Sequence, residues 1–418
     1  MRPRIYWVGL IVLALLAPAC APVVQSEHAT PQATAPVSEE RPLDPTAAPL
    51  APESPLFDPA ESPPAGATRE FRTDFSRHTV SYAEILSGGP PKDGIPAIDA
   101  PQFIDVSAAD TWLDPREPVA VLTSESDEGV IAARAYPLQI LMWHEIVNDV
   151  FGGQPVAVTY CPLCNTAIAF DAELDGMALD FGTTGRLRLS NLIMYDRQTE
   201  SWWQQGTGEA IAGEHAGRRL RMIPVALIAW EDFRTAYPTG EVLSRETGHT
   251  RDYGRNPYTR YDALDSYPFL YDGPQPPTAL SPLARILALE LDGETVAYPY
   301  PILEERRVVN DMAGETPVVV LWHAGAASAL DTGRIAEGRD VGSALAFSRE
   351  VGGRVLTFEV TAEQFIDVET GSAWNHLGQA ISGPLAGTRL TPLVANNYFW
   401  FSWAAFKPET RVYGFSAE

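Results

Sequence analysis

Cysteine is scarce in this chain, with three residues in 418, and the 30 Lys and Arg residues are outnumbered by 54 Asp and Glu residues. A formal net charge of −24 repels nucleic-acid phosphates and anionic lipid headgroups, so the composition excludes an electrostatic nucleic-acid binder. No phosphate-binding glycine loop is present, and the glycine-rich residues 88–94 are typical of a surface turn. The Gly-x-Ser-x-Gly motif of serine hydrolases is also missing.

The N-terminal apolar run, residues 5–17, is too short for a membrane span. It follows Arg2 and Arg4 and precedes Cys20, which is the layout of a bacterial export signal. Small residues before Cys20 indicate a lipoprotein processing site, where the thiol receives diacylglycerol and the membrane becomes a partner. The alternatives are a signal peptide cut near Ala19 and an uncleaved anchor. Each of the three predicts an extracytoplasmic protein of the cell envelope.

Composition divides the chain into an export signal, a tether and a folded remainder. After the export signal (1–19), residues 20–68 are rich in Pro and Ala and poor in large apolar residues, which predicts a disordered tether. The remainder is long enough for two domains with separate cores. We expect a first domain over residues 69–275 and a second over residues 276–418.

Short motifs recur at a constant offset in these two segments. The clearest matches are Ala135-Tyr136-Pro137 with Ala297-Tyr298-Pro299, and Val147-Asn148-Asp149 with Val309-Asn310-Asp311. We interpret the segments as tandem, diverged copies of one unit. Under this alignment Cys161 matches His323, which is itself a possible donor, and Cys164 matches Ala326. The thiol pair therefore belongs to the first copy alone.

Short runs of β-forming residues, bounded by turn residues, predict strands over 156–160, 167–170, 318–322 and 355–360. Apolar residues at helical spacing predict a helix from Pro137 to Gly152 and another from Val225 to about Tyr237. The predicted fold class is α+β and β-dominated, with two tandem diverged copies of one β-rich domain after the tether.

Four motif segments, at 140–149, 159–164, 194–201 and 251–258, together resemble the bacterial and archaeal family catalogued as domain of unknown function 3179. The resemblance extends from about Tyr82 to the C-terminus. It implies exported, often lipid-anchored proteins. It implies no reaction and no catalytic residues, so the function has to be argued from the side chains.

Cys161 and Cys164 form a Cys-x-x-Cys motif directly after a predicted strand. Two thiolates at a tight turn can hold one metal ion, with His144 and Met194 as further candidate ligands, and this soft donor set favours copper(I) or zinc(II). Export favours a disulfide instead, because nothing keeps thiols reduced outside the cytoplasm. A bridge over so short a loop gains little chain entropy, so redox activity is an alternative to a structural role. All three interpretations stay open.

His144 has a second interpretation, as a hydrogen-bonded core histidine. Glu145 and Asp149 are candidates for orienting it or for acid–base chemistry. A zinc-protease helix carries a second histidine four residues after the first, but Asn148 stands at that position, which excludes this class.

Arginine and tryptophan residues around the later motifs suggest a cleft for an anionic ligand. The candidates for this ligand-binding site are Arg197, Trp202, Arg251 and Arg255. Core packing of tryptophan and structural ion pairs of arginine are the alternatives. Trp203 is predicted to be core because it matches Trp374 in the second copy.

The leading hypothesis is an exported, lipid-anchored protein with a metal-binding Cys/His centre in the first domain, holding copper or zinc. The alternatives are an extracytoplasmic dithiol–disulfide oxidoreductase and a noncatalytic ligand-binding lipoprotein with a structural disulfide. The sequence identifies no reaction and no small-molecule or protein partner.

Overall fold

The structure is a computed structural model in which residues 57–125, 131–362 and 364–415 are described. They belong to a compact unit spanning Ala48–Glu418. The export signal, Cys20 and the first part of the predicted tether lie outside the described residues. No helix in the described ranges is long and apolar enough to cross a membrane.

The described fold starts ahead of residue 69, where the first domain was expected to begin. Ala67 is fully buried, and the Glu61 carboxylate accepts hydrogen bonds from Ser81 Oγ (2.7 Å) and Tyr82 N (2.8 Å). These contacts fix residues that composition alone had assigned to the tether.

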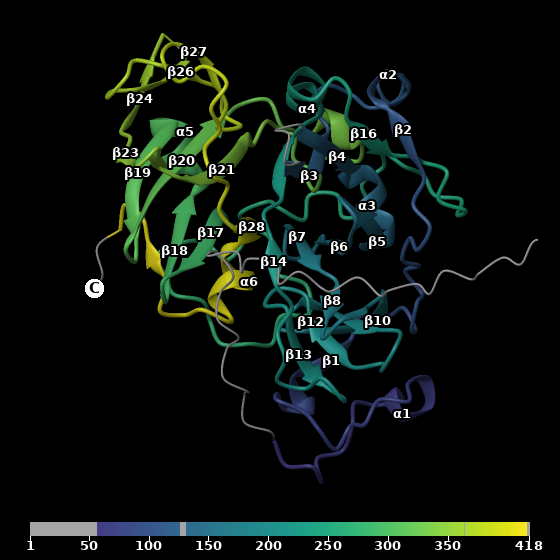
Figure 1. Ribbon diagram of the computed structural model, residues 1–418. Coiled ribbons are helices and arrows are strands. Elements are labelled where there is room, and N and C mark those ends of the chain that lie inside the picture. Colours follow the sequence, from purple (N-terminus) through teal and green to yellow (C-terminus); the bar gives the residue numbers. More distant parts are fainter. Residues whose placement is uncertain (1–56, 126–130, 363, 416–418) are drawn as a thin grey trace, which may run out of the picture. The chain divides into compact units, whose positions relative to one another are not determined.

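The first half of the described chain contains three main sheets and a small hairpin (Figure 1). The first sheet has the order β15-β3-β4-β16-β2 and consists of β2 (Phe103–Asp105), β3 (Pro118–Glu125), β4 (Ile131–Pro137), β15 (Ala226–Ala229) and β16 (Glu241–Leu243). The second has the order β14-β7-β6-β5 and consists of β5 (Ile146–Phe151), β6 (Gln154–Cys161), β7 (Thr166–Asp171) and β14 (Met222–Ile223). The third has the order β1-β10-β11-β12-β13 and consists of β1 (Ile85–Ser87), β10 (Phe181–Arg188), β11 (Asn191–Asp196), β12 (Trp202–Gln204) and β13 (Glu209–Ala212). The hairpin is β8 (Glu173–Leu174) with β9 (Met177–Ala178).

The second half contains three further sheets and a hairpin. A sheet of order β28-β17-β18-β29 consists of β17 (Arg285–Leu291), β18 (Glu294–Pro299), β28 (Ala395–Phe399) and β29 (Arg411–Val412). A second sheet, of order β19-β20-β21, consists of β19 (Val308–Ala313), β20 (Thr316–His323) and β21 (Ser343–Ser348). The others are the hairpin β22 (Glu350–Val351) with β23 (Arg354–Val355), and the sheet of β24 (Phe358–Thr361), β25 (Gln364–Asp367), β26 (Ala373–Trp374) and β27 (Ala380–Ser382).

The helices are short: α1 (Ala67–Glu70), α2 (Val106–Ala109), α3 (Leu138–His144), α4 (Trp230–Ala236), α5 (Tyr300–Arg306) and α6 (Trp400–Ala404), with 3-10 turns at Tyr82–Glu84 and Ile335–Glu337. The β-dominated fold class is therefore confirmed. Strands predicted over 156–160, 167–170 and 318–322 lie within β6, β7 and β20, whereas the run 355–360 is divided between β23 and β24.

Both predicted helices were too long. Helix α3 ends at His144 because Glu145 adopts a left-handed φ of 58°, and the following residues, with Val147, form β5. The apolar spacing that suggested a longer helix belongs to a strand, whose β-branched residues suit a pleated surface. The run from Val225 likewise starts as strand β15 and becomes helical only at Trp230.

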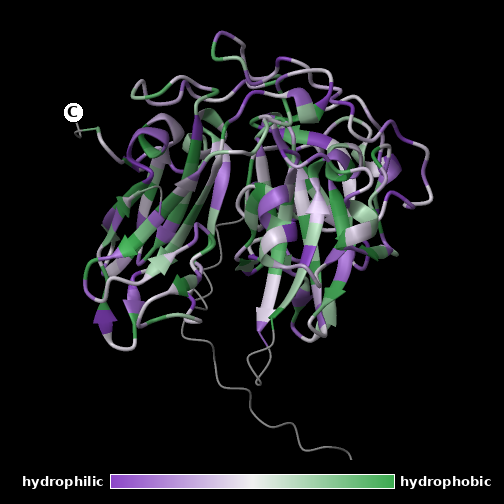
Figure 2. Cartoon of the chain, turned by 90° about the horizontal axis from the view of Figure 1, so that it is seen from above, coloured by the Kyte–Doolittle hydropathy of each residue, from purple (hydrophilic) through white to green (hydrophobic). Residues whose placement is uncertain are grey.

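The hydrophobic core crosses the boundary that was expected at residue 276. One cluster joins Cys161 and Phe170 to Ile286 and Trp400, and another joins Trp230 to residues of β20. In Figure 2 the hydrophobic colour runs along the strands of both halves. The described residues thus bury much of their apolar surface in clusters shared by the two halves, and one further cluster in each half lies wholly within that half.

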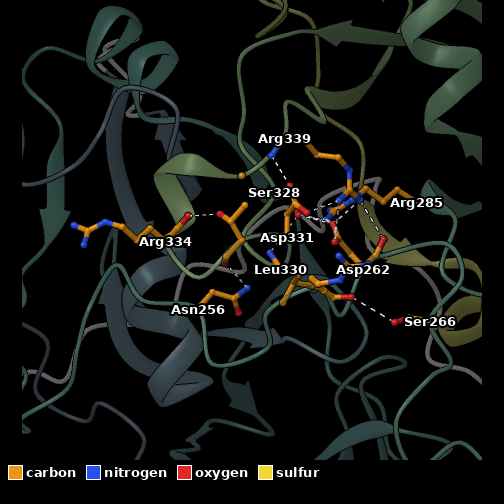
Figure 3. A network of polar contacts seen from close by, with 12 residues as sticks. Asn256, Asp262, Ser266, Arg285, Ser328, Leu330, Asp331, Arg334 and Arg339 are labelled. Carbon is orange, nitrogen blue, oxygen red and sulfur yellow. Dashed lines mark hydrogen bonds and ion pairs between the residues drawn. The ribbon is translucent and has the colours of Figure 1, made fainter.

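A buried carboxylate also links distant segments (Figure 3). Asp262 is 1% exposed, accepts hydrogen bonds from Arg285 Nη2 and Arg339 Nη2, each at 2.7 Å, and accepts a third from Ser328 Oγ at 2.6 Å. Burial alone would raise the pKa of Asp262, but the arginine charges and the hydrogen bonds outweigh burial and lower it. The network ties the β16–β17 connection to the β20–β21 connection.

We predict that Asp262→Ala lowers the free energy of unfolding by about 3–5 kcal/mol, because it leaves two guanidinium groups without their buried counter-charge. Urea denaturation measures the change. Asp265→Ala removes an exposed carboxylate three residues away and should cost less than about 0.5 kcal/mol. Equal losses from the two substitutions would show that the network contributes no special stability.

Candidate functional site

The Cys161–Cys164 pair lies where β6 turns into β7. Cys164 N donates to Cys161 O (3.2 Å), and Asn165 N donates to Pro162 O (3.2 Å), with Asn165 at a φ of 54° that asparagine tolerates. The two sulfurs form a disulfide, with a Cα–Cα distance of 5.3 Å. Both residues are almost completely buried.

His144 has partners on both ring nitrogens. Nδ1 lies 2.7 Å from Pro96 O and Nε2 lies 2.7 Å from Tyr253 Oη, and the residue is fully buried. Burial lowers the pKa of His144 to about 4, although the contact with Pro96 acts in the opposite direction. His144 is therefore a neutral side chain at pH 7, held by hydrogen bonds of its own.

Three of the four predicted metal ligands have other partners: the two cysteines are bonded to each other, and His144 is hydrogen-bonded through both ring nitrogens. Among the described residues, neither cysteine nor His144 belongs to a set of three His, Cys, Asp or Glu ligand atoms within 4.8 Å of one another. Met194 on β11 is fully buried in the same apolar cluster as the cysteines. An ion shared by Cys161, Cys164, His144 and Met194 remains a prediction.

The candidate anion-binding residues each have contacts of their own in the structure. Arg197 pairs with Asp99 at 2.5 Å, and Trp202 is fully buried within the apolar cluster that also contains Phe71. The other two arginines lie elsewhere: Arg251 donates to Thr250 O and Arg255 faces Asp252 at 3.7 Å, largely exposed. Trp203 is fully buried, so its prediction as core is confirmed.

A different cluster does have the composition of a metal site. Asp232, His323 and His376 each present a ligand atom, and these atoms all lie within 4.8 Å of one another. Asp232 Oδ1 lies 3.8 Å from His323 Nε2, and Asp232 Oδ2 lies 3.3 Å from His376 Nε2. The two imidazole rings stack with centroids 4.4 Å apart, so both Nε2 atoms face the same carboxylate.

Packing of the surrounding elements fixes this cluster. Asp232 is on α4, whose Trp230 and Phe233 are fully buried in the same apolar cluster as Leu321 and Trp374. Leu321 lies two residues before His323 on β20, and Trp374 lies two residues before His376. The apolar face of α4 therefore positions its carboxylate over two histidines that come from separate parts of the second half.

Asp232 Oδ2 and His376 Nε2 are both buried and lie 3.3 Å from each other, in a geometry that makes no hydrogen bond, and neither has another hydrogen-bond partner in the described structure. Unsatisfied buried polar atoms are rare in native proteins, because leaving one costs roughly 1–3 kcal/mol. The His323 side chain is 40% exposed, so solvent reaches one side of the cluster. Burial lowers the pKa of His323, with a further lowering by His376 that Asp232 opposes. A neutral His323 is the form that binds metal ions.

Glu145 is a second unusual group. Its carboxyl group is buried at the end of α3, and none of the hydrogen bonds found in the described residues involves it. Burial raises its pKa to about 8, so the carboxyl is mostly protonated at pH 7. It lies close enough to Tyr258 for its charge to raise the pKa of the phenol.

Sequence reasoning found one member of the histidine cluster. His323 was recognised as a possible donor because it stands at the end of its strand where Cys161 stands in the first segment. Asp232 and His376 were missed, since neither lies in a short motif with the other donors. The sequence held only a weak signal for His376. It lies two residues after Trp374, which matches the core residue Trp203 of the first segment.

Comparison with protein families gives one match. The family model described as "Protein of unknown function (DUF3179)" matches residues 92–410. No curated protein and no solved structure matches the chain.

We predict that Glu145→Gln stabilises the protein increasingly as the pH rises. The folded state holds a proton on Glu145 up to a pKa of about 8, whereas the unfolded state loses it near 4.5, so stability is lost as the pH rises through this range. Glutamine cannot ionise, and the gain at pH 7 should be on the order of 3 kcal/mol.

Urea denaturation of the variant and the wild type at pH 5, 7 and 8.5 measures this gain. Glu246→Gln, at an exposed carboxylate, is the matched control and should give a difference independent of pH. A pH-independent difference for Glu145→Gln as well would contradict an uncharged buried carboxyl.

Proposed function

We propose that this chain, which belongs to the DUF3179 family of proteins of unknown function, binds a divalent transition-metal ion between Asp232, His323 and His376. The observation that carries this proposal is the convergence of three ligand atoms within 4.8 Å of one another. In addition, two of the three side chains have a buried polar atom without a hydrogen-bond partner in the described structure. A bound cation would satisfy both atoms.

The chemistry of the donors narrows the choice of ion. Two imidazoles and one carboxylate suit zinc(II) and similar first-row ions, whereas copper(I) prefers thiolates and thioethers. Of the two ions predicted from the sequence, this site favours zinc. Three protein ligands leave a coordination position for water or a substrate, as in catalytic rather than structural zinc sites. The partial exposure of His323 supports an accessible open position.

The charge of the chain favours a cation at this position. A formal net charge of −24 raises the local concentration of divalent ions around the protein. Next to the cluster, the positive Arg307 lowers the pKa of His323 and the negative Asp340 raises it. Arg307 and Asp340 thus have opposite effects on the pKa of His323, and Asp232 is the anionic ligand of the proposed site.

We further propose that the protein acts outside the cytoplasm, anchored by a lipid on Cys20. The support is the order of Arg2 and Arg4, an apolar run and small residues before Cys20. An extracytoplasmic position agrees with a disulfide at Cys161 and Cys164.

We also propose that the two halves are diverged copies of one unit. The element order supports this: hairpins β3–β4 and β17–β18 each lead through a seven-residue helix into a second sheet, and each pairs with a strand from later in the chain. In this proposal β6 corresponds to β20 and α4 to α6. His323 then ends its strand where Cys161 ends the equivalent strand, and the site at His323 also takes Asp232 from the first copy.

Metal analysis of the purified whole chain tests the proposed site. After dialysis against zinc and removal of free ions, mass spectrometry should find one zinc per chain. His376→Gln and Asp232→Asn should each weaken zinc binding by more than roughly 100-fold, because loss of a direct ligand exceeds the 10- to 100-fold cost of losing an outer-shell partner.

Two controls locate the ion. Glu231→Gln changes the adjacent carboxylate on α4 and should leave zinc binding intact. The double substitution Cys161→Ser, Cys164→Ser should also leave it intact. Loss of zinc binding in the double cysteine variant, together with retained zinc binding in His376→Gln, would overturn the proposal and favour the Cys/His centre instead.

Zinc affinity should depend on pH in a defined direction. A protonated imidazole cannot bind an ion, and burial places the pKa of His323 below its ordinary 6.5. The affinity should therefore change little between pH 8 and 7 and should weaken once the pH falls through the lowered pKa of His323. Isothermal titration calorimetry between pH 8 and pH 4 measures it, and an affinity that stays constant over this whole range would contradict histidine ligands.

A further inference from the structure

The surroundings of the Cys161–Cys164 pair consist of hydrogen-bond acceptors. Cys164 Sγ lies 3.1 Å from Asn191 Oδ1 and 3.7 Å from Ser190 O. None of the hydrogen bonds found in the described residues brings a donor to either sulfur. A disulfide sulfur carries no hydrogen, so it cannot satisfy these acceptors, whereas a thiol can donate its S–H.

The orientation of Asn191 is fixed by its other contacts. Its Nδ2 donates to Leu189 O at 2.9 Å, so the carbonyl oxygen must face Cys164. The same Oδ1 accepts a hydrogen bond from Ser402 Oγ at 2.9 Å, which arrives from α6 in the second half. Asn191 is fully buried, so its oxygen has no access to bulk water.

The backbone that carries these acceptors is the two-residue turn between β10 and β11, where Arg188 pairs with Asn191. Leu189 and Ser190 both have left-handed φ values, 52° and 62°, which a tight hairpin turn of this kind requires. Here the conformation directs Ser190 O and Asn191 towards the sulfur.

We propose that Cys161 and Cys164 form a reversible dithiol–disulfide centre, in which Asn191 is the acceptor for the thiol of reduced Cys164. This centre is distinct from the histidine cluster and does not depend on it. In the reduced form Asn191 Oδ1 accepts from both Cys164 and Ser402; in the oxidised form it accepts from Ser402 alone.

The reaction requires a dithiol partner. Reduction breaks the Cys161–Cys164 bond, and each sulfur receives one electron and one proton. A small-molecule or protein dithiol supplies two electrons and two protons and closes its own disulfide. Oxidation is the reverse exchange with a disulfide of the same class.

Residues 261–269 are hydrogen-bonded to residues next to both cysteines. Tyr261 Oη donates to Leu163 O inside the turn (3.1 Å), and Ser190 Oγ donates to Phe269 O (2.5 Å). Between these anchors Leu264 and Tyr267 are exposed. Because both cysteines are buried, a dithiol reaches them only after part of the surrounding structure opens.

Redox titration of the whole chain tests the proposal. The protein is equilibrated in dithiothreitol buffers of graded ratio, alkylated with N-ethylmaleimide and weighed by mass spectrometry, with near-ultraviolet circular dichroism as the check on folding. The wild-type pair should titrate reversibly while the fold is retained. Reduction that occurs only on unfolding would overturn the proposal.

Two substitutions should move the equilibrium in opposite directions. Asn191→Leu removes the acceptor for the thiol and should favour the disulfide by about 3- to 10-fold, the effect of one hydrogen bond. Ser402→Ala should favour the dithiol by a similar factor, because the disulfide form then leaves Asn191 Oδ1 without a donor.

Ser402→Ala also serves if Asn191→Leu fails to fold. His376→Gln, at the separate histidine cluster, should leave the thiol equilibrium unchanged, so the outcomes for the two sites are distinguishable. An unchanged equilibrium in Ser402→Ala, or shifts in the same direction for the two substitutions, would overturn the role of Asn191.

Discussion

The contact of strand β15, which leads into α4, with strand β21 of the second half is the constraint on which the candidate metal site depends. Helix α4 itself packs on β3 and β15, and its Trp230 and Phe233 are buried in a cluster that also includes side chains of β20 and β26. Burial of two large aromatic side chains contributes several kcal/mol, far more than any attraction between Asp232 and two partly buried histidines. The apolar contacts therefore place the carboxylate, and the polar groups take the positions that result.

The second half likewise contributes a helix residue to a polar cluster of the first half. Strand β28 of the second half contacts β7 of the first, and α6 directs Ser402 onto Asn191 beside Cys164. Each half thus contributes a helix residue to the polar cluster of the other: an aspartate over two histidines in one case, a serine next to a disulfide in the other. Because the halves share their hydrophobic clusters, neither cluster of polar residues is complete within one half.

Local sequence patterns predicted the strands well and the helices poorly. Runs such as Val156–Tyr160 are β-branched, bounded by turns and buried, and they are strands in the structure. The helix expected from Pro137 to Gly152 failed because its apolar spacing continued past Glu145, where a left-handed residue ends the helix. Nothing in the local pattern signals that φ value, since glutamate has no preference for it.

The candidate site was only partly predictable for a different reason. Cys161 and Cys164 are three residues apart, so their proximity follows from the sequence, and the disulfide agrees with two of the three interpretations, the structural disulfide and the redox-active pair. Asp232, His323 and His376 are far apart in the chain and meet only through the tertiary contacts between the two halves, such as that of β15 with β21. Sequence spacing carries no information about such a contact without knowledge of the tertiary fold.

Anomalous X-ray diffraction from crystals of the protein soaked in zinc chloride tests the central claim most directly. The account predicts one strong zinc peak between the Asp232 carboxylate and the Nε2 atoms of His323 and His376. A zinc peak at Cys161, Cys164 and Met194, with none beside Asp232, would contradict it.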